Sequence, residues 1–322
     1  MCKEKELTHI YSKGVFMKKK ITKLLNPRLD PNFKAIFTQP TEDSRKALKS
    51  FLTAAIGRQV TKVKVIENEP AKEYAEQRGI SYDINCTFDD GENAQIELQG
   101  FDREYDYGKR AEYYVSRLVS STLEVGDDWS KVPKAYQISV LNFKYDKDKD
   151  EAIHHYTMTD IKDGARLSDT LNIIFIELSK IPPLNEENAE ENLPSIVKWC
   201  KFLKEADNPE KKDLLNRLVK SEEGIMAAET TLSKLSQERW RWIIQGQIEG
   251  RERDIRSGYI AHEQKGLERG RKEGALNTAI ANAKNLLRMN LGTPEQIAQA
   301  VALPLKQVLA LKEEVKDEID VK

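Results

Sequence analysis

Two short segments in which apolar and polar residues alternate, joined by a turn, limit the fold of this chain more than any other feature. Residues 80–88 and 94–99 both alternate with period two, which is typical of strands that bury one face. Residues 89–91 between them read Asp-Asp-Gly and supply turn chemistry. The pattern predicts an antiparallel hairpin, whose apolar faces coincide only if paired residue numbers sum to an even value.

The polar face of this hairpin carries acidic side chains that oppose each other. In the register that pairs Phe88 with Glu92, Asp83 lies opposite Glu97; the neighbouring register of the same parity places Asp83 opposite Gln99. Directly opposed side chains lie roughly 5 Å apart, and like charges at that distance are destabilising. The face shared by Asp83, Glu97 and Gln99 is therefore either solvated or compensated by a cation.

The segments around the hairpin show a mixture of helix and strand patterns. A short helix is expected to begin at Asp30-Pro31, with Asp30 as its N-cap and proline at the first helical position. The other predicted helices cover residues 42–55 and 105–123, and the predicted strands cover 60–66, 135–143, 152–159 and 171–178. We expect an α/β core, a mixed sheet flanked by helices, over residues 27–180.

The remainder of the chain is helical in pattern. Residues 181–245 form a polar helical extension, and residues 246–290 carry glycines spaced in multiples of four. Each glycine costs a helix about 1 kcal/mol, so this stretch either permits close helix approach, as in self-association, or is a charged linker. Residues 291–322 read as a helix-turn-helix-sized module whose second helix has few basic residues. Packing or formation of a homo-oligomer through these C-terminal helices is therefore favoured over reading of a DNA groove.

Composition excludes some classes of protein. The charged fraction is 33%, the net charge is −1, and no apolar run approaches the ~18 residues of a spanning helix. Three widely separated cysteines favour a reducing, cytoplasmic location over a disulfide framework. The neutral balance does not favour a protein that only binds nucleic acid, although the basic segment 13–23 is either a local patch or a tail. Met17 before three lysines resembles a translation start, which would leave residues 1–16 outside the functional protein.

Four short elements follow one another in a recognisable order. They are Asp30-x-x-Phe33-Lys34, then Asp83, then Glu97-Leu98-Gln99, then Arg110-x-x-x-Tyr114. The set resembles the PD-(D/E)XK nucleases, and among them the recombination-promoting (transposase-associated) nuclease family, with Gln99 where lysine is usual. The resemblance covers about residues 27–180. It implies a restriction-endonuclease-like core with an all-α C-terminal extension.

The same resemblance implies a function and a site. The chain would be a metal-dependent DNA endonuclease of little sequence specificity that promotes recombination. Asp83 and Glu97 would bind Mg²⁺, with Mn²⁺ or Ca²⁺ as alternatives, and the Leu98 carbonyl would add a ligand. Gln99 would position the attacking water. Because Gln99 has no positive charge, the stabilisation of negative charge would come from the metal or from Arg110.

Several roles stay open. Asp30 is either a plain N-cap or a third acid beside the metal. Arg110 and Tyr114 either bind the phosphate backbone or brace the sheet. The alternative function is a catalytically weak or inactive DNA-binding protein on a nuclease fold. A true transposase fits poorly, because its acidic triad needs a much longer gap before the last Glu than the 14 positions between Asp83 and Glu97.

Overall fold

A computed structural model describes residues 23–69, 81–101, 106–120, 122–123, 125–186 and 192–320. The chain divides into two compact units, Met1–Gly246 and Gln247–Lys322. Of the basic segment 13–23, only Lys23 lies within the described residues. None of the helices in the described ranges is long and apolar enough to cross a membrane.

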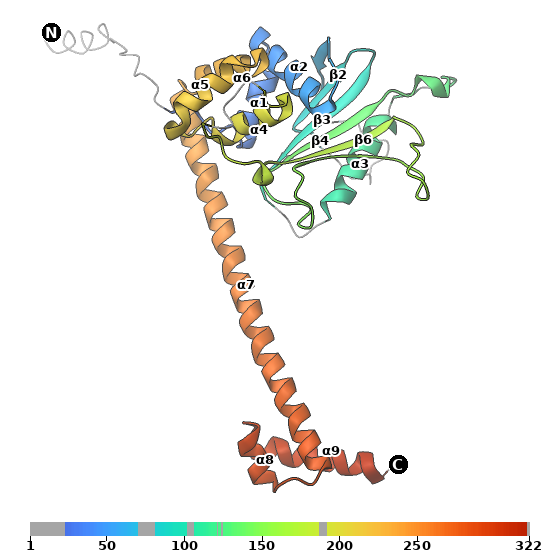
Figure 1. Cartoon of the computed structure of the whole chain (residues 1–322), viewed down its shortest axis with the longest axis vertical. Helices are drawn as coiled ribbons and strands as arrows, with labels where there is room; N and C mark the ends of the chain where they lie inside the picture. Colours follow the sequence, from blue (N-terminus) through green and yellow to red (C-terminus); the bar gives the residue numbers. More distant parts are fainter. Residues whose placement is uncertain are drawn as a thin grey trace, which may run out of the picture. The chain divides into compact units, whose positions relative to one another are not determined.

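A six-stranded mixed sheet forms the centre of the first unit (Figure 1). Its spatial order is β1-β2-β3-β4-β6-β5. The strands are β1 (Val63–Val65), β2 (Ile84–Phe88), β3 (Glu92–Gln99), β4 (Ala135–Leu141), β5 (Ile153–Thr157) and β6 (Leu171–Glu177). The pairs β3–β4 and β4–β6 are parallel, and the outer pairs are antiparallel. Strand β4 is central and entirely buried, as its continuous apolar run predicts.

The hairpin of β2 and β3 has the first of the two predicted registers. Phe88 pairs with Glu92 and Ile84 with Ile96, so paired numbers sum to an even value and the apolar faces coincide. The predicted strand is too long at its start, because β2 begins at Ile84 and not at residue 80. Before Ile84 the backbone leaves the ladder: the Tyr82 N–H donates to the Asn68 carbonyl at 2.8 Å.

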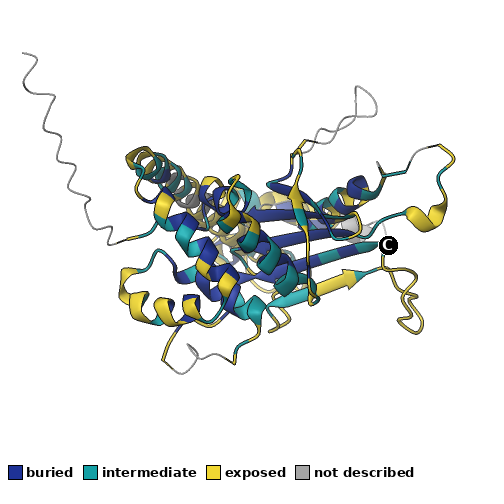
Figure 2. Ribbon diagram, turned by 90° about the horizontal axis from the view of Figure 1, so that it is seen from above, coloured by how far each residue is buried: buried dark blue, intermediate teal, exposed yellow. Residues whose placement is uncertain are grey.

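Helices cover both faces of the sheet (Figures 1 and 2). One face packs against α1 (Asp30–Thr38), α2 (Glu42–Ile56), α4 (Ser195–Glu205), α5 (Lys212–Lys220) and α6 (Glu223–Leu235) in one large apolar cluster. Helix α3 (Tyr107–Ser120) packs on the other face through Val115 and Leu118 near one end and Tyr107 and Ala111 near the other. The helices of segment 181–245 thus share their core with the sheet.

The helices α1 and α2 differ in how their N-termini are capped. The Thr41 side chain accepts a hydrogen bond from the Ser44 N–H at the start of α2, and Gly57 in the left-handed region ends it. The predicted N-cap role of Asp30 is wrong. Leu29 occupies that position, and Asp30 is the first helical residue and caps nothing. Its carboxylate instead pairs with Lys34 one turn along, at 3.0 Å.

The second unit consists of helices alone. Helix α7 (Arg239–Arg288) continues into it and is followed by α8 (Pro294–Ala300) and α9 (Leu305–Asp320). Thr293 and Gln296 form the capping box that starts α8, with proline in the first turn as expected. Ile297, Val308 and Ala283 share a small apolar core. A Cβ added at Gly258, Gly266, Gly270 or Gly274 would meet no atom within 4 Å, so self-association through these helices stays a prediction.

Candidate active site

Asp83 lies where the chain enters β2, and both of its carboxylate oxygens are engaged. Oδ2 accepts a hydrogen bond from the Leu98 N–H at 2.8 Å. Oδ1 lies 3.1 Å from the Lys34 ammonium. The bend at Asp83 thus directs its carboxylate toward the backbone of Leu98 on β3. Leu98 directly follows Glu97 in the sequence.

The backbone of Leu98 faces the same side as Asp83. Its neighbours on β3 use their backbone groups toward β4: the Asn142 N–H donates to the Gln99 carbonyl at 3.0 Å, and the Asn93 N–H donates to the Lys134 carbonyl at 2.9 Å. Because backbone groups alternate sides along a strand, both the N–H and the C=O of Leu98 turn toward β2. The predicted carbonyl ligand is therefore on the side of β3 where Asp83 lies.

Glu97 is buried on the α3 face of the sheet, with 2% of its surface exposed. Its Oε2 accepts from the Arg110 guanidinium of α3 at 2.8 Å. Its Oε1 is buried and has no hydrogen-bond partner among the described residues. A buried carboxylate oxygen without a partner is energetically costly, and this oxygen is available to accept a hydrogen bond or to bind a cation.

Arg110 is held by aromatic rings as well as by Glu97. Its guanidinium lies 4.8 Å from the ring centre of Tyr114 and 5.8 Å from that of Tyr107. The Tyr114 ring in turn makes an edge contact with Tyr82 at 5.6 Å. Of the two roles left open for Tyr114, this packing supports the bracing role, because the ring supports the arginine that contacts Glu97.

Both polar atoms of the Gln99 side-chain amide form hydrogen bonds to nearby residues. Its Nε2 donates to the Phe101 carbonyl at 3.1 Å, and its Oε1 accepts from Arg110 at 3.5 Å. Only 7% of its surface is exposed. In this conformation the amide helps to orient Arg110, and a water-positioning role requires it to exchange the bond to Phe101.

Both acids of the site have raised pKa values. Burial raises the pKa of Glu97 to about 8, and the nearby charge of Asp83 adds to the rise against the opposing effect of Arg110. Burial also raises the pKa of Asp83, against the opposing Leu98 hydrogen bond and Lys34. Carboxyl groups whose ionisation is hindered by burial and nearby acids are a common property of metal and catalytic sites.

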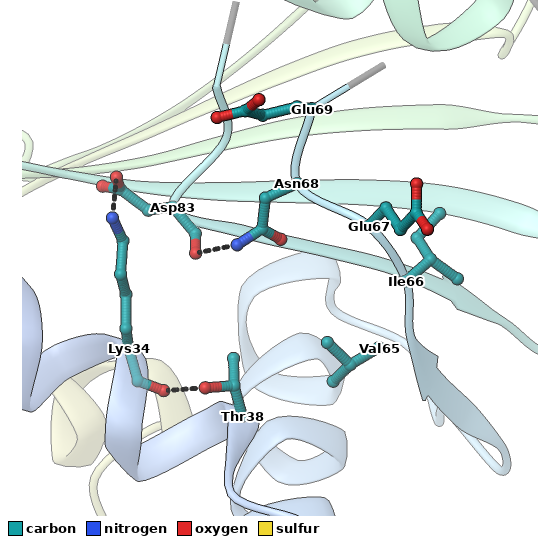
Figure 3. Close-up of a pocket in the computed structure, with 8 residues that line it drawn as sticks. All are labelled: Lys34, Thr38, Val65, Ile66, Glu67, Asn68, Glu69 and Asp83. Atoms are coloured by element: carbon teal, nitrogen blue, oxygen red, sulfur yellow. Dashed lines mark hydrogen bonds and ion pairs between the residues drawn. The ribbon is translucent and has the colours of Figure 1, made fainter. Parts of the chain in front are cut away.

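Lys34 is a member of the site that was not singled out from the sequence. Its ammonium lies 3.0 Å from Asp30 and 3.1 Å from Asp83, and so joins the two acids. It borders a pocket of 510 Å³ whose other wall is the segment from Val65 to Glu69 (Figure 3). The sequence offered two signals: Lys34 belongs to the Asp30-x-x-Phe33-Lys34 element of the family resemblance, and it lies four residues after Asp30, on the same side of a helix.

The donor set matches a hard divalent cation. Among the residues that the structure describes, no group of three or more His, Cys, Asp or Glu side chains is placed to hold a metal ion. Mg²⁺ often takes only one or two carboxylates and fills its other positions with water. Asp83, the unpartnered Oε1 of Glu97 and the Leu98 carbonyl fit that requirement.

Comparison with known proteins agrees with this geometry. No curated protein sequence and no solved structure matches the chain. One family model, described as PD-(D/E)XK nuclease family transposase, matches residues 27–257. The match includes the whole sheet, the helices around it and every residue of the site. The mixed sheet flanked by helices is consistent with the restriction-endonuclease-like fold, and the chain belongs to the PD-(D/E)XK nuclease family transposases.

Proposed function

We propose that this protein is a metal-dependent endonuclease that hydrolyses phosphodiester bonds in DNA with little sequence specificity, and that it promotes DNA recombination. One observation carries the proposal: Glu97 keeps a buried carboxylate oxygen that has no hydrogen-bond partner among the described residues, and burial, with the charge of Asp83 added, raises the pKa of Glu97. A divalent cation satisfies both acids at once. Membership of a nuclease family supports the same function.

The reaction has simple requirements. A water oxygen adds to phosphorus and loses a proton, while one P–O bond breaks and the leaving oxygen gains a proton. When bound by Asp83, Glu97 and the Leu98 carbonyl, Mg²⁺ would supply an activated water and neutralise charge on the phosphate. Mn²⁺ would serve in the same way, and Ca²⁺ would support DNA binding.

The side chains of this site have distinct tasks. The Leu98 N–H fixes the Asp83 carboxylate through a bond of 2.8 Å. Arg110 orients Glu97 and holds one oxygen, so that the other stays directed at the site. Gln99 supports Arg110, and after exchange of its bond to Phe101 it would orient the attacking water. Asp30 acts through Lys34, and not as a direct metal ligand.

Cleavage of supercoiled plasmid tests the proposal. Wild type with Mg²⁺ or Mn²⁺ should produce nicked or linear DNA, and EDTA should stop the reaction. Asp83→Asn and Glu97→Gln keep the size of each side chain and should abolish cleavage. Asp43→Asn is the matched control, because Asp43 is a surface acid paired with Lys234 on another helix.

A second function would produce a different result. Gln99 stands where the family motif usually has lysine, and this departure favours a catalytically inactive DNA-binding protein. If folded wild type binds DNA but cleaves none with any of these metals, the endonuclease proposal is wrong and the binding function replaces it.

A further inference from the structure

The site contains a cation that the usual motif does not require at this position. Lys34 belongs to α1, on the face of the sheet opposite to α3, yet its ammonium lies 3.1 Å from Asp83 Oδ1. The two acids are thus flanked by cations from opposite faces, Lys34 at Asp83 and Arg110 at Glu97. Figure 3 shows the Lys34 side chain extended along the pocket toward Asp83.

Two polar side chains on the α3 side of the acids, Arg110 and Gln99, are committed to protein partners. Arg110 bonds to Glu97 at 2.8 Å and lies over the Tyr114 ring. Gln99 carries no charge and donates to the Phe101 carbonyl. Lys34 is paired with Asp30 and Asp83, but it is not stacked on an aromatic ring, so a phosphate that approaches the acids meets Lys34 as the more mobile of the two cations.

Lys34 has the reach and freedom that such a contact needs. A third of its side chain is exposed, and it lines a pocket of 510 Å³ beside Asp83. A lysine ammonium is a compact point charge on a flexible stem, and it can leave a carboxylate for a phosphate without a change of backbone. When a bound cation neutralises the charge of Asp83, the attraction between the Lys34 ammonium and Asp83 becomes much weaker.

A purely structural role for the ion pairs of Lys34 does not explain its position as well. Half of the Asp30 side chain is exposed, so water already satisfies that acid without a lysine. Surface ion pairs of this kind contribute little to stability. The stabilisation of Asp83 would likewise be redundant once a divalent cation binds it.

We infer that Lys34 is a catalytic residue that contacts the scissile phosphate and neutralises the charge that develops on it, in place of the lysine that Gln99 has replaced. The inference rests on the proposed endonuclease function. It adds no covalent step, because Lys34 supplies only charge and hydrogen bonds. The substrate group that it recognises is the phosphodiester itself.

Moving the positive charge tests this inference. Lys34→Met should lower kcat for cleavage at saturating Mg²⁺ by about 100-fold, the usual effect of removing one group that stabilises transition-state charge. The Kd for DNA in Ca²⁺ should change by less than about three-fold, because most phosphate contacts remain. The double variant Lys34→Met with Gln99→Lys should recover at least about ten-fold of the lost kcat. Lys46→Met, which removes an exposed lysine paired with Glu223, should keep the activity of wild type.

The outcomes separate this inference from the proposed function. If Lys34→Met cleaves like wild type while Asp83→Asn and Glu97→Gln do not cleave, the role of Lys34 is refuted and the endonuclease stands. If Lys34→Met instead binds Mn²⁺ more tightly at unchanged kcat, Lys34 only neutralises Asp83 in the metal-free protein, which also refutes it. Absence of cleavage by wild type refutes both proposals. A fall in kcat that the thermal stability of Lys34→Met does not explain, with recovery in the double variant, supports it.

Discussion

Glu97 and Arg110 form a one-sided pair: the guanidinium lies 2.8 Å from Oε2 of the carboxylate, while Oε1 stays buried without a hydrogen-bond partner in the described part of the chain. Burial therefore dominates over the arginine and raises the pKa of Glu97 from 4.5 to about 8. The protonated acid is the form that the metal-free fold prefers.

This pair predicts how stability depends on pH. An acid whose pKa is raised by folding makes the protein lose stability with rising pH wherever the unfolded chain is ionised and the native chain is not, and the loss remains above that range. As pH rises from 4.5 toward 8, metal-free wild type should therefore lose stability relative to Glu97→Gln, on the order of 5 kcal/mol in total. Urea denaturation in EDTA at pH 5 and pH 8 measures the difference. Equal slopes for the two proteins would show that Glu97 ionises normally.

Arg110 should stabilise the protein only through Glu97. At pH 9.5, above the pKa of Glu97, Arg110→Met should cost about 2 kcal/mol, because the ionised and buried acid loses its cation. The same change in the Glu97→Gln background should cost much less, and the difference is the coupling energy of the pair. The neighbouring exposed Lys109, paired with Asp106, is the control, and Lys109→Met should have little effect. Equal costs in both backgrounds would assign the role of Arg110 to its aromatic contacts.

The contact between α2 and α6 predicts an unequal effect of the same substitution at two glycines. A Cβ at Gly224 would lie 2.0 Å from the Ser50 Cβ, and the Ser50 hydroxyl accepts from the Trp199 indole N–H at 3.1 Å. Gly224→Ala should therefore destabilise the first unit by ~1–3 kcal/mol. At Gly246 nothing lies within 4 Å, so Gly246→Ala should stabilise α7 by up to about 1 kcal/mol. Thermal unfolding of both variants measures this contrast, and a neutral Gly224→Ala would contradict the close packing.

Local periodicity predicted the hairpin and its register because strand alternation and turn chemistry act between residues close in sequence. The pairing of Phe88 with Glu92 follows from the alternation around a three-residue turn. The same reasoning extended β2 too far, since the bend at Asp83 depends on Asn68, whose carbonyl accepts from the Tyr82 N–H. Alternation within 81–88 contains no information about that partner.

The site was predicted less completely, for a related physical reason. Asp83 and Glu97 are both hairpin residues, so one local motif brings them together. Lys34 joins Asp83 only because α1 packs on the sheet through Phe33 and Phe37, and no local pattern encodes that docking. The misassigned cap at Asp30 has a local origin, because the carboxylate pairs with Lys34 one turn along the same helix and leaves the helix end uncapped.

Binding of Mn²⁺, measured by calorimetry in the absence of DNA, tests most directly that Asp83 and Glu97 form one metal site. Wild type should bind the ion, and Asp83→Asn and Glu97→Gln should each weaken binding by at least about ten-fold, or ~1.4 kcal/mol. Glu223→Gln, which alters an exposed acid paired with Lys46, should bind Mn²⁺ as wild type does. If both active-site variants bind Mn²⁺ with the affinity of wild type, the two carboxylates are not its ligands and the account is contradicted.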